Sequence, residues 1–563
     1  MNKYKYLILT LGLAGFLGMT SCSESFLDVT SKTESNTENF YKTEKDAWRA
    51  LIGCYDGWRR VMSTDGPVTF LIASNILSDE TLGGGGVGDG SANIVLDHFD
   101  TSYGPGQQTI FTYDWKLYYA GIYRCNELIT RAEQIKWESE ETKGLYLGEA
   151  RAIRAIMYFD LVRLFGNIPL FLEPSSENRA QADPAEVYAH IFDDLQYAIA
   201  NIPADKNTSV DDHGRITRYA AEAIMARAYL YYSGYYGKEP GFTPADGETI
   251  GSVTKADALA AVTDIITSGK YGLIDDFKDL WPAASLVPIP GELGWAEGSS
   301  YAGDANKEVI LAMKFFPTYN YPSGEDNYAL QASNRLLVNM GMRNFNDCPP
   351  YGKGWGVCTV TPEFLEMFEN GDKRLAPSVI DMEGEGIASK ASFEACYLDW
   401  RNYTGYSNKK YTPIIFGNGS PFANAEGTLD FMINNPEQFV MVRYADVLLM
   451  AAELGAPQGA TYLNNIRKRA GLGEVALTQK NIMDERAREL AFEGLRYWDL
   501  LRQGVDVMAD AVCASGGKIW NGGVETTNSY VRSKIVATKG LQQIPQDQIT
   551  LSNGVLVQNE GWR

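Results

Sequence analysis

The fold is decided by MVRYADVLLMAAE (441–453), followed by LNNIRKRAGL (463–472) and ERARELAFEGLRYWDLLRQG (485–504). Apolar residues recur every three or four positions, which predicts three successive amphipathic helices with tight breaks between them. The last helix should bury one stripe, made of Met483, Ala487, Leu490, Ala491, Leu495 and Trp498. Its other face carries opposite charges at i,i+3 spacing, in the pairs Arg486–Glu489, Glu493–Arg496 and Asp499–Arg502. This alternation predicts a solvated, salt-bridged surface whose pairs contribute only about 0.2–0.5 kcal/mol each.

In this order, the phrases RYADVLLMAAE, LNNIRKRAG and ERARELAFEGLRYWDLLR closely resemble the C-terminal signature of the SusD/RagB family. The GDKR run at 371–374 and the tail LQQIPQDQITLSNGVLVQNEGW (541–562) are similar to that family as well. The resemblance implies a mostly α fold, in which a TPR-like scaffold of helical hairpins carries a large irregular, loop-rich insertion. It also implies a binding protein that is not an enzyme and uses no cofactor. The family consists of surface lipoproteins that pass nutrients to a TonB-dependent transporter.

The N-terminus has the pattern of an exported lipoprotein. Lys3 and Lys5 precede an apolar run, 7–19, that is too short to remain as a membrane anchor. The run ends in Met-Thr-Ser-Cys, which resembles a bacterial lipobox and predicts a signal peptide over 1–21 and lipid attachment at Cys22. An ordinary secretory signal with an incidental cysteine is the alternative. With the lipid, the protein would sit on the outer membrane and face the cell exterior.

Three regions are expected to follow a lipid-attached tether over 22–42. The first, 43–236, should be helical, with helices over 43–62, 109–134, 144–165, 184–201 and 217–236 and a Gly- and Asp-rich loop over 78–106. Within it, 149–166 and 221–237 align at an offset of 71 residues, about two periods of a 34-residue tetratricopeptide repeat. The second, 237–436, is rich in Gly, Pro, Asn and Trp and predicts an irregular insertion, with helices only at 255–268 and 361–370 and an extended piece at 308–315. The third, 437–563, contains the signature.

Composition restricts the ligand. The formal net charge is −21, which argues against nucleic acid because that ligand needs a basic surface. Aromatic residues make up 12% of the chain. Tyr and Trp combine an apolar face with a polar edge, which suits binding surfaces, although helical repeats also use Tyr for packing.

Candidate ligand residues lie in the Pro- and Gly-rich loops of the insertion, and the family resemblance implies that the N-terminal loop 75–100 contributes to the same site. Sugars are held by aromatic faces, while Asp, Asn, Gln and Arg side chains bond to the hydroxyl groups. The candidates are Trp281, Trp295, Tyr301, Tyr351 and Trp355 from the insertion, and Asp79 and Asn93 from the N-terminal loop. Local packing is the alternative role for each ring, whereas Trp48, Trp115 and Trp498 have helical periodicity and are assigned to the core.

Other chemistry finds little support. The run GGGGVG (83–88) matches a nucleotide-binding pattern only trivially and favours a mobile surface loop. The nearby Asp79, Asp89, Asp97 and Asp100 lack the spacing of a calcium-binding EF-hand, so no metal is assigned. No catalytic signature for hydrolases or kinases is present. Cys348 and Cys358 are spaced either for a disulfide across a loop or for buried thiols.

The sequence therefore favours a non-catalytic lipoprotein that captures an oligosaccharide and delivers it to a SusC-like TonB-dependent transporter. Two alternatives stay open at this point. One is capture of peptides, as in RagB-like members of the family, and the other is a TPR scaffold that binds another protein.

Overall fold

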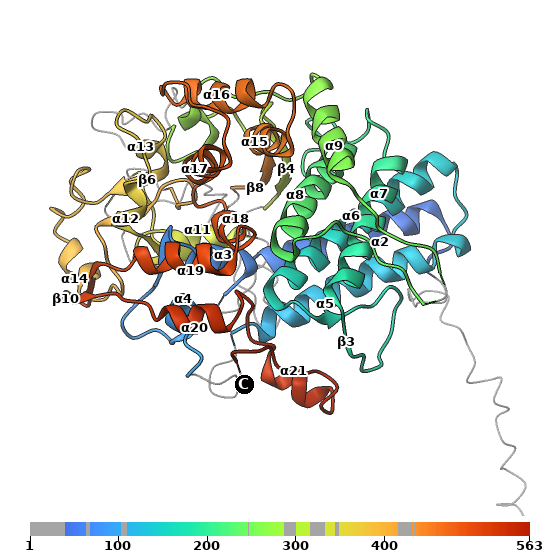
Figure 1. Cartoon of the computed structure of the whole chain (residues 1–563), viewed down its shortest axis with the longest axis horizontal. Coiled ribbons are helices and arrows are strands. Elements are labelled where there is room, and N and C mark those ends of the chain that lie inside the picture. The colour runs from blue at the N-terminus through green and yellow to red at the C-terminus, as the bar shows by residue number, and fades with distance from the viewer. Residues whose placement is uncertain are drawn as a thin grey trace, which may run out of the picture.

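The computed structural model describes residues 40–63, 68–102, 110–245, 247–285, 300–315, 333–343, 348, 350–414, 431–432, 435 and 437–562. Helices dominate, and every sheet among these residues has two strands. Figure 1 shows the long helices between residues 44 and 267 on one side, and most of the shorter insertion and C-terminal elements on the other. The leader, Cys22 and Trp295 lie outside the described residues, and within those residues no helix has the length and apolarity to cross a membrane.

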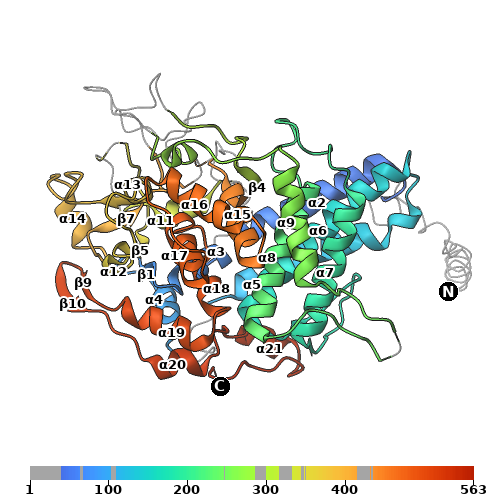
Figure 2. The same ribbon diagram turned by 45° about the horizontal axis from the view of Figure 1, so that its top comes forward.

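The N-terminal scaffold is a layer of long helices that pack against their neighbours in the chain. It consists of α2 (Glu44–Met62), α5 (Thr112–Thr130), α6 (Glu140–Phe165), α7 (Pro184–Asn201), α8 (Arg218–Tyr236) and α9 (Lys255–Thr267). Figure 2 shows α6 to α9 side by side. All six helices overlap their predicted ranges closely, and the result is the mostly helical fold that the sequence predicted.

Local sequence signals explain why these helices begin and end where they do. The Thr43 side chain caps α2 and forms a reciprocal capping box with Asp46. Asp183 caps α7 and Pro184 occupies its first position, which places the start of the helix at the predicted residue. Gly237 ends α8 in the left-handed region (φ 66°), where glycine is the least strained residue. The aligned alanines of α6 and α8 are fully buried, which lets the helices pack closely; they are Ala152, Ala155, Ala223 and Ala226.

The remaining chain forms short elements. The antiparallel strand pairs are β1 (Thr81–Gly84) with β5 (Val357–Val360), β2 (Ile168–Pro169) with β3 (Gln181–Ala182), β4 (Val309–Met313) with β8 (Phe439–Arg443), β6 (Val379–Asp381) with β7 (Tyr406–Asn408), and β9 (Lys518–Asn521) with β10 (Val524–Thr527). The shorter helices are α3 (Phe70–Ile76), α4 (Ala92–Asp97), α11 (Arg335–Met340), α12 (Pro362–Leu365), α13 (Leu375–Ser378), α14 (Phe393–Tyr397), α15 (Tyr444–Leu454), α16 (Gly459–Arg469), α17 (Gln479–Glu489), α18 (Arg496–Leu501), α19 (Val505–Ala514), α20 (Arg532–Ala537) and α21 (Gln546–Leu551). The pairs β1–β5 and β4–β8 join the insertion to both ends of the chain.

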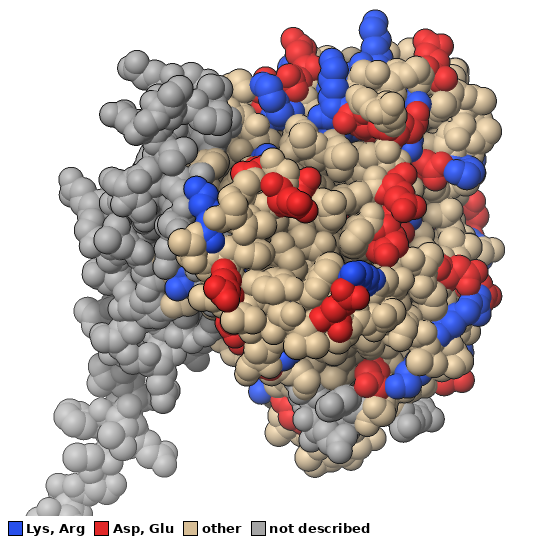
Figure 3. Space-filling model, turned by 90° about the vertical axis from the view of Figure 1, so that its left-hand side faces the viewer, with Lys and Arg blue, Asp and Glu red and all other residues tan. Residues whose placement is uncertain are grey.

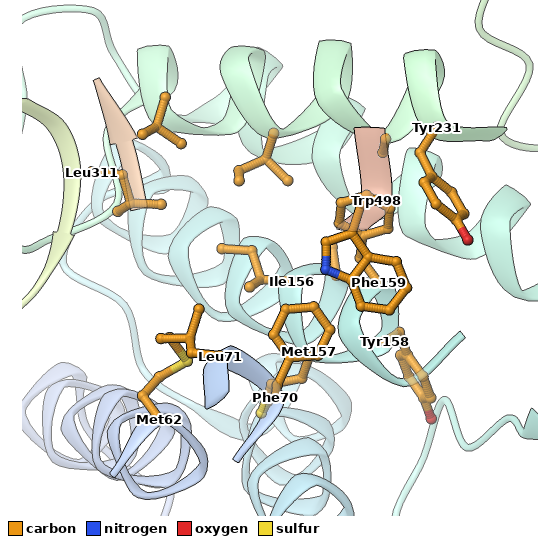
Figure 4. Packing of buried hydrophobic residues seen from close by; sticks show 14 of the residues in the cluster. Met62, Phe70, Leu71, Ile156, Met157, Tyr158, Phe159, Tyr231, Leu311 and Trp498 are labelled. Atoms are coloured by element: carbon orange, nitrogen blue, oxygen red, sulfur yellow. The ribbon is translucent and has the colours of Figure 1, made fainter. Parts of the chain in front are cut away.

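One hydrophobic core unites the helical scaffold with the C-terminal signature. Trp498 of α18 stacks on Phe70 of α3 with ring centroids 5.3 Å apart, and its indole N–H donates to Ser74 Oγ (2.9 Å). Tyr231 of α8 meets Trp498 edge to face at 5.9 Å. Figure 4 shows these rings beside Phe159 and Ile156 of α6. The signature is thus part of the central core, and the assignment of Trp498 to that core is confirmed.

The prediction of one continuous helix over 485–504 is wrong. The chain leaves the helical conformation after α17 and resumes it at Arg496, because Phe492 (φ 63°) and Gly494 (φ 72°) adopt left-handed backbone angles. A Cβ atom added to Gly494 would lie 3.0 Å from the Leu71 side chain, so the non-helical segment packs closely against α3. A φ of 63° is rare for phenylalanine, but the Phe492 ring is fully buried, which stabilises the turn.

The predicted solvated charges are also buried. We use the name central ion cluster for Glu308, Asp372, Arg374, Lys410, Arg443, Arg469, Glu485, Glu489 and Glu493, whose side chains are at most 4% exposed. Arg443 Nη1 lies 2.9 Å from Glu308 and 2.5 Å from Glu489. Of the three predicted i,i+3 pairs, Asp499–Arg502 is present (2.9 Å), whereas Glu489 pairs instead with arginines far away in the chain. The charge pattern could be read from the sequence, but the long-range ion-pair partners could not.

The glycine-rich run is only in part the surface loop that the sequence favoured, because Gly83 to Gly86 are buried and only Val87 and Gly88 are exposed. Thr81–Gly84 is strand β1, and Thr81 to Gly86 are all buried. A Cβ at Gly84 would lie 2.3 Å from the Gly356 carbonyl oxygen, and one at Gly86 would lie 2.0 Å from Arg343. Glycine is needed here because the insertion approaches the backbone closely. The predicted helix over 361–370 is also shorter than expected and spans only α12.

Candidate glycan-binding site

The candidate site lies where the N-terminal loop meets the insertion. Strand β1 pairs with β5, and beyond it the Gly85 N–H donates to the Gly356 carbonyl (2.8 Å). The Arg401 N–H donates to the Gly85 carbonyl (2.8 Å), and the Val87 N–H to the Asp399 carbonyl (3.1 Å). These bonds hold loop 85–90 between two parts of the insertion. The sequence prediction that the two regions form one site requires this proximity.

Arg343 organises the polar groups of the junction. Its Nη2 and Nε donate to Asp399 Oδ2 (2.8 and 3.0 Å), and its Nη1 donates to Asp89 Oδ2 (3.0 Å). The Arg343 side chain is 12% exposed, whereas those of Asp399 and Asp89 are 40% and 49% exposed. A largely buried guanidinium therefore orients two half-exposed carboxylates, which remain accessible to hydroxyl groups of a ligand.

Trp355 is the aromatic residue linked to Arg343. The backbone N–H of Trp355 donates to the Val338 carbonyl (2.7 Å), and its backbone carbonyl accepts from Arg343 Nη1 (3.3 Å). The Arg335 guanidinium lies 4.8 Å from the ring centroid, so it covers one face. The indole is half-buried, which leaves part of the ring accessible. We use the name Arg343 junction for Asp89, Asn93, Arg343, Trp355, Asp399 and Arg401.

Asn93 lies at the same turn as Asp89. A Cβ built on Gly85 would be 3.3 Å from Asp89 Oδ2 and 3.8 Å from Asn93 Nδ2, so the two side chains flank this glycine. The Asn93 Oδ1 atom is buried and accepts no hydrogen bond from the described residues. Arg401 donates to the carbonyls of Gly90, Val87 and Asp89, which fixes the loop that carries both polar groups.

The other predicted residues lie elsewhere. Trp281 was expected to be an exposed ring, but it is 1% exposed and packs edge to face on Tyr411 (5.4 Å), so that expectation is wrong. Tyr351 is also buried, and its hydroxyl donates to Glu385 (2.5 Å). Asp79 is engaged by Arg496 through two hydrogen bonds of 2.7 and 2.8 Å, which gives it a structural role. A Pro/Gly-rich composition did not show that these segments fold onto the core.

Tyr301 is half-buried, and its hydroxyl donates to Asp304 (2.7 Å). Neither Tyr301 nor Asp304 is among the residues that form the Arg343 junction. Its candidacy as a ligand residue stays a prediction.

The four aspartates considered for calcium each bond to a different partner. Asp97 accepts hydrogen bonds from Tyr530 and from the Gly83 N–H, and Asp100 pairs with Lys534. Across the described residues, no three His, Cys, Asp or Glu side chains are grouped so as to hold a metal ion. Cys348 and Cys358 were predicted either to form a disulfide or to be buried thiols. In the structure both are buried free thiols.

Sequence reasoning missed Arg343, Asp399 and Arg401. The segment YLDWRNYTGY (397–406) combines aromatic and charged residues and could have indicated the site. Beside the junction, Tyr397 stacks on Phe393 at 5.6 Å, and both rings are half-buried. Figure 3 views the side that carries α14 and β10, where charges of both signs are scattered among uncharged side chains. No large field of one sign covers this face, as suits an uncharged ligand.

The helical scaffold and the irregular insertion bring half-buried rings, carboxylates and guanidinium groups together, which suits the binding of a polar ligand. Comparisons with known proteins identify the kind of protein. Residues 381–562 match the model of the SusD family, and residues 89–230 match a model described as starch-binding, associating with the outer membrane. The two matched models both describe SusD-type proteins and together span more than half of the chain, so the chain belongs to the SusD family, whose members are non-catalytic glycan-binding proteins, as the sequence predicted.

Individual relatives agree with this assignment. The chain is 24% identical over 433 residues to SusD-like protein P25 of Formosa agariphila, which covers 70% of this chain and 71% of that protein. It is 25% identical to the solved structure of surface glycan-binding protein A from Bacteroides fluxus, with 92% and 99% of the two chains covered and a TM-score of 0.70. A laminarin-binding SusD-like protein is similar at 25% identity, the same coverage and a TM-score of 0.69.

Proposed function

We propose that this chain is a cell-surface lipoprotein that captures an oligosaccharide at the Arg343 junction and delivers it to a SusC-like TonB-dependent transporter. The observation that carries the proposal is that Arg343 joins the backbone carbonyl of the half-buried Trp355 to the half-exposed carboxylates of Asp89 and Asp399. The ring would cover the apolar face of a sugar, and the carboxylates would accept bonds from its hydroxyl groups. Laminarin-type glucans are the first ligands to test, since one of the similar solved structures is that of a laminarin-binding SusD-like protein.

The same proposal includes the tethering and the division of the chain. Cys22, after a signal peptide over 1–21, would carry the lipid, and 22–42 would connect it to the folded part. Regions 43–236, 237–436 and 437–563 would then serve as scaffold, ligand-facing insertion and core-forming C-terminus. The matched family segments leave 231–380 between them, and this interval contains Arg343 and Trp355. Variation there would set the choice of glycan while the scaffold stays constant.

The test is calorimetric titration of the purified protein with laminarin oligosaccharides. Trp355→Ala and Asp89→Asn should each weaken binding about threefold to tenfold, since a well-placed ring contributes about 0.5–1.5 kcal/mol beyond its buried area. Tyr113→Ala and Asp506→Asn are matched controls, because both residues are exposed and lie outside the junction. Binding that neither junction variant changes would refute the site. Binding of peptides but of no glycan would instead favour the RagB-like alternative.

A further inference from the structure

A second cavity lies on the opposite side of the molecule from the Arg343 junction. It has a volume of about 340 Å³ and lies between α5, the loop 168–182 and α21. Figure 1 places α5 and α21 at the lower right, whereas α14 and β10 lie at the far left. The two sites therefore do not share a wall.

Aromatic rings line this cavity along one face of α5. Trp115, Tyr119 and Tyr123 are spaced at i, i+4 and i+8, so each is displaced from the next by about 6 Å along the helix axis. Trp115 and Tyr119 have ring centroids 5.2 Å apart, and Phe171 meets Tyr119 edge to face at 5.9 Å. The Trp115 side chain is almost buried (4%), while Tyr123 is 46% exposed. The rings form a wall that runs from the floor of the cavity to its mouth.

Hydrogen bonds fix this wall before any ligand arrives. The Tyr119 hydroxyl donates to the Pro169 carbonyl (2.9 Å), and Asn126 Nδ2 donates to the Phe171 carbonyl (2.9 Å). Both bonds hold loop 168–182 on α5. On the other side, Lys116 of α5 pairs with Asp547 of α21 (3.3 Å). A cavity that is already shaped loses little conformational entropy on binding.

The polar groups at the mouth have no net charge between them. Glu173 and Glu177 line the cavity together with Lys116 and Arg179, and all four are exposed residues. Two anions balance two cations, so neither an anionic nor a cationic ligand is favoured. Rings beside such alternating donors and acceptors suit an uncharged ligand with many hydroxyl groups.

We infer that this cavity is a second carbohydrate site, which holds one end or branch of a neutral oligosaccharide while the Arg343 junction holds another chain or segment. The inference rests on the proposed function, because it assigns the same class of ligand to a second place. Two separated sites on one chain would raise the avidity for a polysaccharide well above that of either site alone. They would contribute little to the binding of short oligosaccharides, which reach only one site at a time.

The experiment is calorimetric titration of laminarihexaose into five proteins: the wild type, Trp355→Ala, Tyr123→Ala, the double variant, and Tyr113→Ala as control. Tyr113 lies on the same helix and is similarly exposed (39%), but it does not line the cavity. We expect the Trp355→Ala variant to retain residual binding. Adding Tyr123→Ala, in the double variant, should weaken this residual binding about threefold to tenfold. The Tyr113→Ala variant should bind as the wild type does. Circular dichroism confirms that each variant is folded.

Each other outcome decides between the two sites. Residual binding that Tyr123→Ala leaves unchanged, or complete loss of binding in Trp355→Ala alone, would overturn the second site and leave the proposed function intact. If Tyr123→Ala abolishes binding and Trp355→Ala leaves binding unchanged, the second site is supported and the Arg343 junction is refuted. No binding to the wild type would overturn both.

Discussion

Replacing Glu489 by glutamine tests whether the central ion cluster holds the C-terminal signature together. Glu489 is fully buried, and its carboxylate accepts from Arg374 (3.1 Å), Arg443 (2.5 Å) and Arg469. Although burial alone would raise its pKa, the guanidinium groups of Arg469, Arg443 and Arg374 lower the pKa of Glu489 well below its usual range. The native state therefore contains the ionised form at neutral pH. Glutamine keeps the size of the side chain and removes only the charge.

The expected cost follows from the geometry of the cluster. Removing one member of a buried ion pair typically destabilises a protein by about 3–5 kcal/mol, because the partner's charge stays buried. Here three arginines lose one shared anion, but Glu308 and Glu493 still contact Arg443, and Glu308 still contacts Arg469. The remaining carboxylates compensate in part. We therefore expect a loss of about 3 kcal/mol in the free energy of unfolding.

Urea denaturation at pH 7, followed by tryptophan fluorescence, measures this loss. Two Glu→Gln controls separate charge from burial. Glu80 is also buried, but burial and the neighbouring Asp79 raise its pKa to about 8, so it is mostly protonated at pH 7 and Glu80→Gln should cost less than about 1 kcal/mol. Glu525 pairs with Lys518 at the surface, and Glu525→Gln should cost about 0–1 kcal/mol. Equal losses at Glu489 and Glu80 would refute the reasoning, since burial rather than charge would then decide.

Three further predictions follow from the same structure. Acidification from pH 5 to pH 3 should lower the melting temperature, because the pKa of Glu489 is lower in the folded than in the unfolded state and its stabilisation is lost as pH falls; a melting series that stays flat would contradict this. The pKa of Glu80 is raised in the folded state, so the stability that its protonated form contributes is lost as pH rises through about 8. Because glutamine does not titrate, the free energy of unfolding of the Glu80→Gln variant, measured in urea, should rise relative to that of the wild type by more than about 1 kcal/mol between pH 5 and pH 9. Gly84→Ala should destabilise the fold by about 1–3 kcal/mol, since φ is 63° and the new Cβ would lie 2.3 Å from the Gly356 carbonyl oxygen; Gly88→Ala, where nothing lies within 4 Å, is its control.

The helical scaffold could be predicted from sequence because its signals are local. Capping residues such as Thr43 and Asp183, and the end signal at Gly237, act within one helical turn. The course of the signature could not be predicted in the same way. Its break at Phe492 is stabilised by packing against α3, more than 400 residues earlier in the chain, and periodicity within the segment does not reveal that contact.

The prediction named the region of the candidate site, but only some of the residues that form it. The family resemblance implied that the N-terminal loop and the insertion share one site, and the structure brings the predicted Asn93 and Trp355 near Asp89, which was not predicted as a ligand residue. Composition could not distinguish Trp355 from Trp281, since both lie near Pro and Gly. Their exposure depends on whether the following chain folds over the ring, as Tyr411 does over Trp281. Arg343 was missed because its role comes from two carboxylates that are distant in the sequence.

The buried charges give the irregular insertion a fixed position without regular secondary structure. Arg374 and Lys410 belong to the insertion, and both bond to carboxylates that follow the signature helix α15, at Glu489 and Glu493. Asp79, next to the glycine-rich strand, is held in the same way by Arg496. Hydrophobic contacts are non-directional, whereas such bonds require one geometry, so they select one placement of the loops from many compact ones. A site built from loops needs that selection, because a displacement of about 1 Å is enough to impair the geometry of a binding site. The alternating charges of the signature are therefore best understood as the anchors that position the ligand-facing loops.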